Sequence, residues 1–74
     1  MNTVSSRVKQ LREENGLNKT EFAKKVGVNR TTITRYESGE LKPTLGVMIE
    51  INRAFGVSLD WIAGLTANKE GDKK

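Results

Sequence analysis

The stretch VGVNRTTITRYESGE, residues 26–40, decides the fold of this chain of 74 residues. Its middle, from Thr31 to Thr34, is a run of four β-branched residues, which lose rotamer freedom in a helix and pack well on a pleated sheet. By propensity alone the run is a strand. Its flanks disagree, because Gly-Val-Asn in front and Tyr-Glu-Ser-Gly behind are typical of the two ends of a short helix.

Four further segments have apolar residues at the spacing of a helix. They run from about Ser5 to Asn15, from Asn18 to Gly27, from Thr44 to Gly56 and from Ser58 onward. Their inward-facing residues are expected to be Val4, Val8, Leu11, Phe22, Ala23, Val26, Leu45, Met48, Ile51, Phe55, Trp61, Ile62 and Leu65. No two-residue alternation is long enough for a sheet, so a strand in the quoted stretch would have no partner for its backbone groups. Leaving those backbone groups unpaired costs far more free energy than placing Thr and Ile in a helix, where they are less favourable than good helix formers by only about a few tenths of a kcal/mol per residue. The sequence therefore predicts an all-α domain of five helices, with the quoted stretch as the third.

Length and composition limit the chain to one small domain. One modest core is expected within residues 1–65, while residues 66–74 are polar, lack periodicity and are expected to form a disordered tail or linker. Thirteen Lys and Arg against nine Asp and Glu give a net charge of +4, which attracts a polyanion without identifying one. No apolar run approaches the roughly 20 residues of a membrane span, and no secretory signal core is present. We therefore expect a cytoplasmic protein without membrane contact.

Enzyme chemistry finds little support in the residue types. The chain has no cysteine and no histidine, which excludes zinc sites built on these ligands, thiol nucleophiles and imidazole bases. Glu13 and Glu14 form the only adjacent carboxylate pair, and on a helix they point about 100° apart, as on an ordinary solvated face. No phosphate-binding loop or nucleophile constellation accompanies them. We expect no catalytic residue, metal, cofactor or small-molecule ligand.

The third helix, if Asn29 caps it and Arg30 begins it, divides into two faces. At 100° per residue, Ile33 and Tyr36 fall on one arc with the hidden side of Thr32. The other arc is wholly polar and consists of Arg30, Thr31, Thr34 and Arg35. Short hydroxyl side chains between two arginines suit close approach to DNA, where arginine can bind guanine O6 and N7 and threonine can contact bases or phosphate. On composition alone, an ordinary solvated helix face explains this arc equally well.

The link in front of this helix favours the DNA interpretation. Gly27 can take a positive φ at no steric cost, Val28 can bury beneath the corner, and Asn29 can cap. A small residue, Ala23, lies four positions before the glycine and lets two helices approach closely. These are the requirements of a three-to-four-residue turn between two helices at a steep angle.

Two stretches resemble one known family over most of the chain. They are RVKQLREENGLNKTEFAKKVGVNRTTITRYESGE, residues 7–40, and KPTLGVMIEINRAFGVSLDWIAGL, residues 42–65. Both are similar to the lambda-repressor-like helix-turn-helix proteins, also called the xenobiotic-response-element family, which includes phage repressors and Cro proteins. The resemblance implies that the second and third helices form the helix-turn-helix and that the third lies in the major groove of DNA.

The resemblance also implies roles for individual residues. The base-reading positions are Arg30, Thr31, Thr34 and Arg35, and the phosphate-contacting positions are Lys19, Asn29, Thr32, Lys42 and Thr44. Lys19 departs from the glutamine that is frequent in the family, where this residue contacts a backbone phosphate and braces the first base-reading residue; a lysine can keep the phosphate contact. Arg12 and Glu37 match a pair that locks two helices together, and Gly27 matches the glycine of the turn.

The function implied is that of a sequence-specific regulator of transcription, expected to be a repressor. Its partner would be double-stranded DNA with a palindromic operator, bound by a homodimer. The candidates for the dimer interface are Val57 and Leu59, both expected to be exposed. Two alternatives stay open at this point. One is an antitoxin or other protein-binding regulator of the same fold, and the other is the DNA-binding fragment of a longer phage-type repressor.

Overall fold

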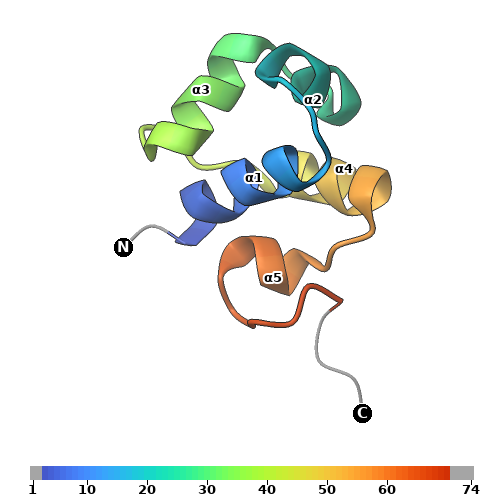
Figure 1. The fold of residues 1–74 in the computed structure, drawn as a ribbon. Helices are drawn as coiled ribbons and strands as arrows, with labels where there is room; N and C mark the ends of the chain where they lie inside the picture. The colour runs from blue at the N-terminus through green and yellow to red at the C-terminus, as the bar shows by residue number, and fades with distance from the viewer. Residues whose placement is uncertain (1–2, 71–74) are drawn as a thin grey trace.

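The fold is known from a computed structural model that describes residues 3–70. Five α-helices follow one another: α1 (Thr3–Glu14), α2 (Lys19–Val26), α3 (Arg30–Ser38), α4 (Leu45–Phe55) and α5 (Leu59–Ala63). Residues 3–70 contain no strand, so the predicted all-α class and the helical state of the Thr-rich stretch are confirmed (Figure 1). None of these helices is long and apolar enough to cross a membrane.

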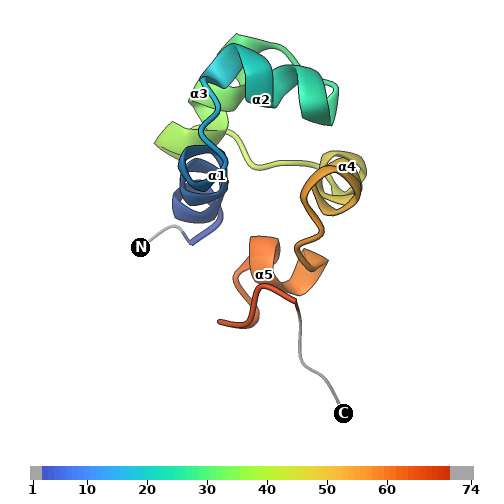
Figure 2. The same cartoon turned by 45° about the vertical axis from the view of Figure 1, so that its right-hand side comes forward.

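The helices surround one core. Figures 1 and 2 show α2 and α3 together at one end of the molecule, α5 at the other end, and α1 and α4 between them. Accordingly, α1 packs on α3 and α5, and α2 packs on α3 and α4. The buried core side chains are Val8, Leu11, Phe22, Ala23, Val26, Ile33, Tyr36, Ile51, Val57, Trp61 and Ile62. The pair α2–α3 is therefore supported from below by α1 and α4.

Local side-chain hydrogen bonds explain where the helices begin. The Asn18 side chain accepts from the backbone amide of Glu21 at 2.7 Å, and the Glu21 carboxylate accepts from the backbone amide of Asn18 at 2.9 Å, which together form a capping box. Thr44 and Ser58 cap α4 and α5 by accepting from the amide three residues on. Each cap satisfies a donor that the helix itself leaves without a partner.

Three apolar positions differ from the expectation. Leu45 is 66% exposed and Leu65 is 75% exposed, so neither belongs to the core. On α4, the inward-facing residues from Val47 to Phe55 span about 100° of the helix, and Leu45 lies about 60° beyond the edge of that arc. Leu65 follows Gly64, whose left-handed conformation ends α5 and turns the chain away from the core.

Val57 differs in the opposite sense, because it is buried with 6% of its surface exposed. The side chain of Asn52 donates to the Val57 carbonyl at 2.7 Å and so holds the α4–α5 link against the end of α4. The expected exposure of Val57 is therefore wrong, and Val57 contributes to the core instead of a free surface. Leu59 is half-buried.

The segment after Leu65 returns to the helices as far as Glu70. The Ser58 amide donates to the Lys69 carbonyl at 2.7 Å, and the Arg7 guanidinium donates to the carbonyl of Thr66 at 2.6 Å. The Lys69 ammonium forms an ion pair with Glu14 and lies 5.6 Å from the centre of a ring of Trp61. The rest of the expected tail, residues 71–74, lies outside the described residues, so the predicted domain boundary stays a prediction.

Candidate nucleic-acid interface

The corner between α2 and α3 has the geometry expected from the sequence. Gly27 has φ 78° and ψ 27°, in the left-handed region that glycine enters without steric cost. The amides of Gly27 and Val28 both donate to the Ala23 carbonyl, which closes the end of α2. Asn29 is extended, and its side chain accepts from the Thr32 amide at 2.8 Å, which opens α3. The turn therefore fixes the direction in which α3 leaves α2.

The two faces of α3 are those expected from placing its residues at 100° intervals around the helix axis. Ile33 is fully buried and Tyr36 is 3% exposed, and burial raises the pKa of the Tyr36 hydroxyl above its ordinary 10.0. On the opposite face, Arg30, Thr31 and Arg35 are exposed. Thr34, which belongs to the predicted polar arc, and Thr32, at the edge of it, are half-buried. The helix is thus fixed by its apolar side and presents an exposed polar arc that contains both arginines.

The hydroxyl groups of α3 are already partly engaged. Thr34 donates its proton to the Arg30 carbonyl at 3.3 Å, and Thr32 donates to the Asn29 side chain at 2.9 Å. Thr32 and Thr34 therefore offer their methyl groups and oxygen lone pairs to a ligand instead of a free O–H donor.

The two arginines of the arc differ in their surroundings. Within residues 3–70, Arg30 has no hydrogen-bond or ion-pair partner for its side chain, whereas Arg35 lies with Nε 3.7 Å from a carboxylate oxygen of Glu40. Sequence reasoning missed Glu40. The available signal was the Gly39-Glu40 pair, because a glycine cap reverses the chain at the end of a helix and can return the next side chain to it.

The residues expected to contact phosphate lie at helix starts. Lys19 is the first residue of α2 and is half-buried, and Lys42 is exposed in the link before α4. Thr44 is the N-cap of α4, with its Oγ1 accepting from the Val47 amide at 3.3 Å. The first amides of a helix have no intrahelical acceptor, and the helix dipole favours an anion at this end. The start of α4 has no acidic residue in its first turn and can receive an anion, whereas the start of α2 already holds the Glu21 carboxylate, so a phosphate there would depend on the charge of Lys19.

The predicted pair of Arg12 and Glu37 is present and is the best-protected ion pair of the described residues. Arg12 Nε and Nη2 donate to the two Glu37 carboxylate oxygens at 2.6 and 3.1 Å, and Nη1 donates to the Leu17 carbonyl at 3.1 Å. The side chains are only 14% and 7% exposed. The hydrogen bond to Glu37 and its charge raise the pKa of Arg12. This pair attaches α1 to the last turn of α3.

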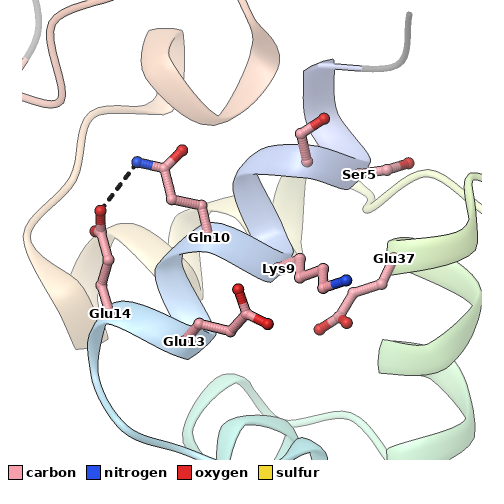
Figure 3. Close-up of a pocket in the computed structure, with 7 residues that line it drawn as sticks. Ser5, Lys9, Gln10, Glu13, Glu14 and Glu37 are labelled. Atoms are coloured by element: carbon pink, nitrogen blue, oxygen red, sulfur yellow. Dashed lines mark hydrogen bonds between the residues drawn. The ribbon is translucent and has the colours of Figure 1, made fainter.

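An open depression of about 420 Å³ lies beside α1 and has Glu37 of this pair in its lining (Figure 3). Its lining is polar and consists of Ser5, Ser6, Lys9, Gln10, Glu13, Glu14 and Glu37. Glu37 is held by Arg12, and Glu14 accepts from Gln10 at 3.0 Å and pairs with Lys69. The lining has three carboxylates and one lysine, so it does not resemble a surface that binds phosphate.

Comparisons with known proteins identify what the chain is similar to. A family model described as helix-turn-helix matches residues 8–62. An HTH-type transcriptional regulator of Haemophilus influenzae is 43% identical over 44 residues, which cover 60% of this chain and 18% of that protein. The CTXphi phage transcriptional repressor RstR of Vibrio cholerae is 35% identical over 66 residues, which cover 89% of this chain and 57% of that protein. This chain therefore spans only part of the length of these relatives.

A solved structure shares the fold. The P22 c2 repressor, in a crystal structure with a synthetic operator, matches with a TM-score of 0.81 over 89% of this chain and 100% of that one. The two sequences are only 20% identical, so this likeness concerns the arrangement of the helices alone.

Proposed function

The chain belongs to the helix-turn-helix family whose model it matches, and from this premise we propose that it is a sequence-specific, double-stranded DNA-binding regulator of transcription that acts as a repressor. The observation that carries the proposal is the exposed polar arc of α3 opposite its buried face of Ile33 and Tyr36. A helix that only covered the core would gain nothing from two β-branched residues on its solvent face, since they are poorer helix formers than Glu, Lys or Gln. The relatives described above, an HTH-type transcriptional regulator and a phage repressor, support the same proposal.

Base reading is assigned to the arc of α3. An α-helix is about 10–12 Å across with its side chains, so α3 can enter a major groove about 12 Å wide. Arg30 and Arg35 can each bind guanine O6 and N7 with two N–H groups. Thr31 and Thr34 are short enough to let the helix approach, and their methyl groups can pack on the methyl of thymine.

Phosphate contacts are assigned to the residues that flank the arc, which are Lys19, Asn29, Thr32, Lys42 and Thr44. Lys19 and Lys42 supply charge, and the start of α4 supplies unpaired amides. Such contacts set the position of a protein on the duplex but do not read its sequence. They would place α3 in register with the base edges.

A homodimer on a palindromic operator completes the proposal. Symmetric pairs of helix-turn-helix motifs read half-sites about one turn of DNA apart. Leu59, half-buried at the start of α5, remains the candidate for the dimer contact. Binding to operator DNA would take place in the cytoplasm.

A second candidate is favoured by the comparisons, namely that this domain is the DNA-binding part of a longer regulator. The chain covers 18% and 57% of the two relatives described above, so in both of them other segments accompany the shared domain. DNA binding is common to both candidates. They differ in whether dimerisation comes from this domain or from further segments.

Selection of bound duplexes from a random DNA pool at physiological salt tests the proposal. The expected result is one enriched motif with two inverted half-sites, because each protomer of a dimer presents the same α3. A variant in which both Arg30 and Arg35 are changed to Ala is the matched control, and it should enrich nothing. A pool that stays random with the unaltered protein would contradict sequence-specific binding.

A further inference from the structure

The end of α3 folds the chain back onto the base-reading arc. Gly39 is left-handed, with φ 84°, and its amide donates to the carbonyls of Arg35 and Tyr36. The amides of Glu40 and Leu41 also donate to the Arg35 carbonyl, at 3.0 and 3.2 Å. This wraps the segment after the helix around its last turn. The Glu40 side chain is thereby placed beside that of Arg35 by backbone hydrogen bonds that do not depend on the carboxylate.

Glu40 is an unexpected residue for this place. Its carboxylate lies 3.7 Å from Arg35 Nε, and the two side chains are 66% and 54% exposed. A negative charge next to a surface meant for DNA repels phosphate, so it lowers affinity for every sequence. A carboxylate that costs affinity in this way needs a compensating role if it belongs to the site.

Its position suggests that role. The ion pair engages Nε of Arg35, and the two terminal nitrogens stay available as a fork for guanine. On DNA without a guanine at that place, an unrestrained arginine can turn to a phosphate and still contribute to binding. Glu40 opposes this, because it attracts the guanidinium and repels the phosphate. Arg30 has no such partner within residues 3–70, so only one of the two arginines is restrained.

We propose that Glu40 determines specificity by acting through Arg35: it restrains Arg35 to base reading and so reduces binding to DNA that lacks the matching base. The inference rests on the proposed function, since it presumes that α3 reads bases. Glu40 is a positioning residue in this scheme and need not touch DNA itself.

The size of the effect follows from the exposure of the pair. Exposed ion pairs change an equilibrium constant by up to about fivefold. Glu40→Gln should therefore raise affinity for a scrambled duplex by about threefold to fivefold and change affinity for the selected motif by less. If Arg35 then reaches a phosphate on scrambled DNA, the slope of log K against log salt becomes steeper by about 0.9.

A matched control separates this effect from net charge. Glu50→Gln removes the same charge from another exposed ion pair, with Arg53 at 4.0 Å on α4, and it lies outside α3 and the predicted contact residues. Fluorescence anisotropy would measure the unaltered protein and both variants on a duplex with the selected motif and on a scrambled duplex of the same composition. The same two Gln variants would then be made in an Arg35→Ala background.

The expected outcome is a lower ratio of specific to non-specific affinity for Glu40→Gln than for Glu50→Gln, and no difference between the two when Arg35 is Ala. Selection with Glu40→Gln should relax base preference at the position that Arg35→Ala relaxes, while the position that depends on Arg30 stays unchanged. Equal ratios for the two Gln variants, or relaxation at the Arg30 position as well, would overturn the role of Glu40. If the unaltered protein selects no motif, the proposed function fails first, and that outcome is visible before any variant is made.

Discussion

Replacing Arg12 with Met tests how firmly α3 is held in place. The substitution removes a charge and three hydrogen bonds, two to Glu37 and one to the Leu17 carbonyl, and it keeps an unbranched apolar stem. What remains is a Glu37 carboxylate with 7% of its side chain exposed and no other ion-pair partner among the described residues. The loss is therefore electrostatic and is not a loss of packing.

The magnitude follows from this burial. Removing one member of a buried ion pair costs about 3–5 kcal/mol, and because Arg12 is 14% exposed we take the lower end, about 3 kcal/mol. At about 4–8 °C per kcal/mol for a domain of this size, Tm should fall by at least about 12 °C. Thermal unfolding followed by circular dichroism measures this directly.

The double variant Arg12→Met with Glu37→Met is the control. It leaves no unpaired charge, so it should recover most of the stability that the single variant loses. A single variant that loses less than about 1 kcal/mol, the range of exposed pairs, would refute the reasoning. A double variant whose loss equals the sum of the two single losses would refute it as well, because the two side chains would then not be coupled.

Three further predictions concern the turn, the phosphate contacts and the C-terminal segment. A Cβ at Gly27 would meet nothing within 4 Å, so Gly27→Ala should lower the free energy of unfolding only by the left-handed backbone strain, about 1–2 kcal/mol, as measured by chemical denaturation. Gly27→Val should lower it further, because a β-branched residue is strained more at positive φ. An unchanged stability of the Val variant would reject the turn. Lys19→Ala and Lys42→Ala should each weaken binding to every duplex and reduce the salt slope by about 0.9, and a variant with an unchanged slope does not contact phosphate. The hydrogen bond from Lys69 lowers the pKa of Glu14 from its ordinary 4.5, so this contact stabilises the fold above that pH and is lost as the pH falls through the lowered value. An NMR titration of Glu14 should show a rise in its pKa on Lys69→Ala, and equal values in the two proteins would mean that the contact does not form in solution.

The features that the sequence predicts well are local. The capping box of Asn18 and Glu21, the cap at Asn29 and the left-handed Gly27 all depend on residues within four positions of one another. The two faces of α3 follow from the helical period alone. The Arg12–Glu37 pair, although 25 residues apart, came from the family resemblance and not from the spacing.

The features that the sequence did not reveal depend on how separate elements meet. Val57 is buried because its link is tied to the end of α4, and Leu65 is exposed because Gly64 turns the chain away. The contacts of Lys69 with α1 and α5 join residues far apart in a polar segment without periodicity. Glu40 is next to Arg35 only through the backbone reversal at the end of α3, which a helical count cannot describe.

The central claim is that the polar arc of α3 reads bases, and selection from a random DNA pool with Arg30→Ala and Arg35→Ala tests it most directly. Each variant should lose about 1–3 kcal/mol on the motif of the unaltered protein and relax base preference at its own position in each half-site. A uniform loss of affinity with an unchanged motif would contradict the claim, because the two arginines would then touch only phosphates.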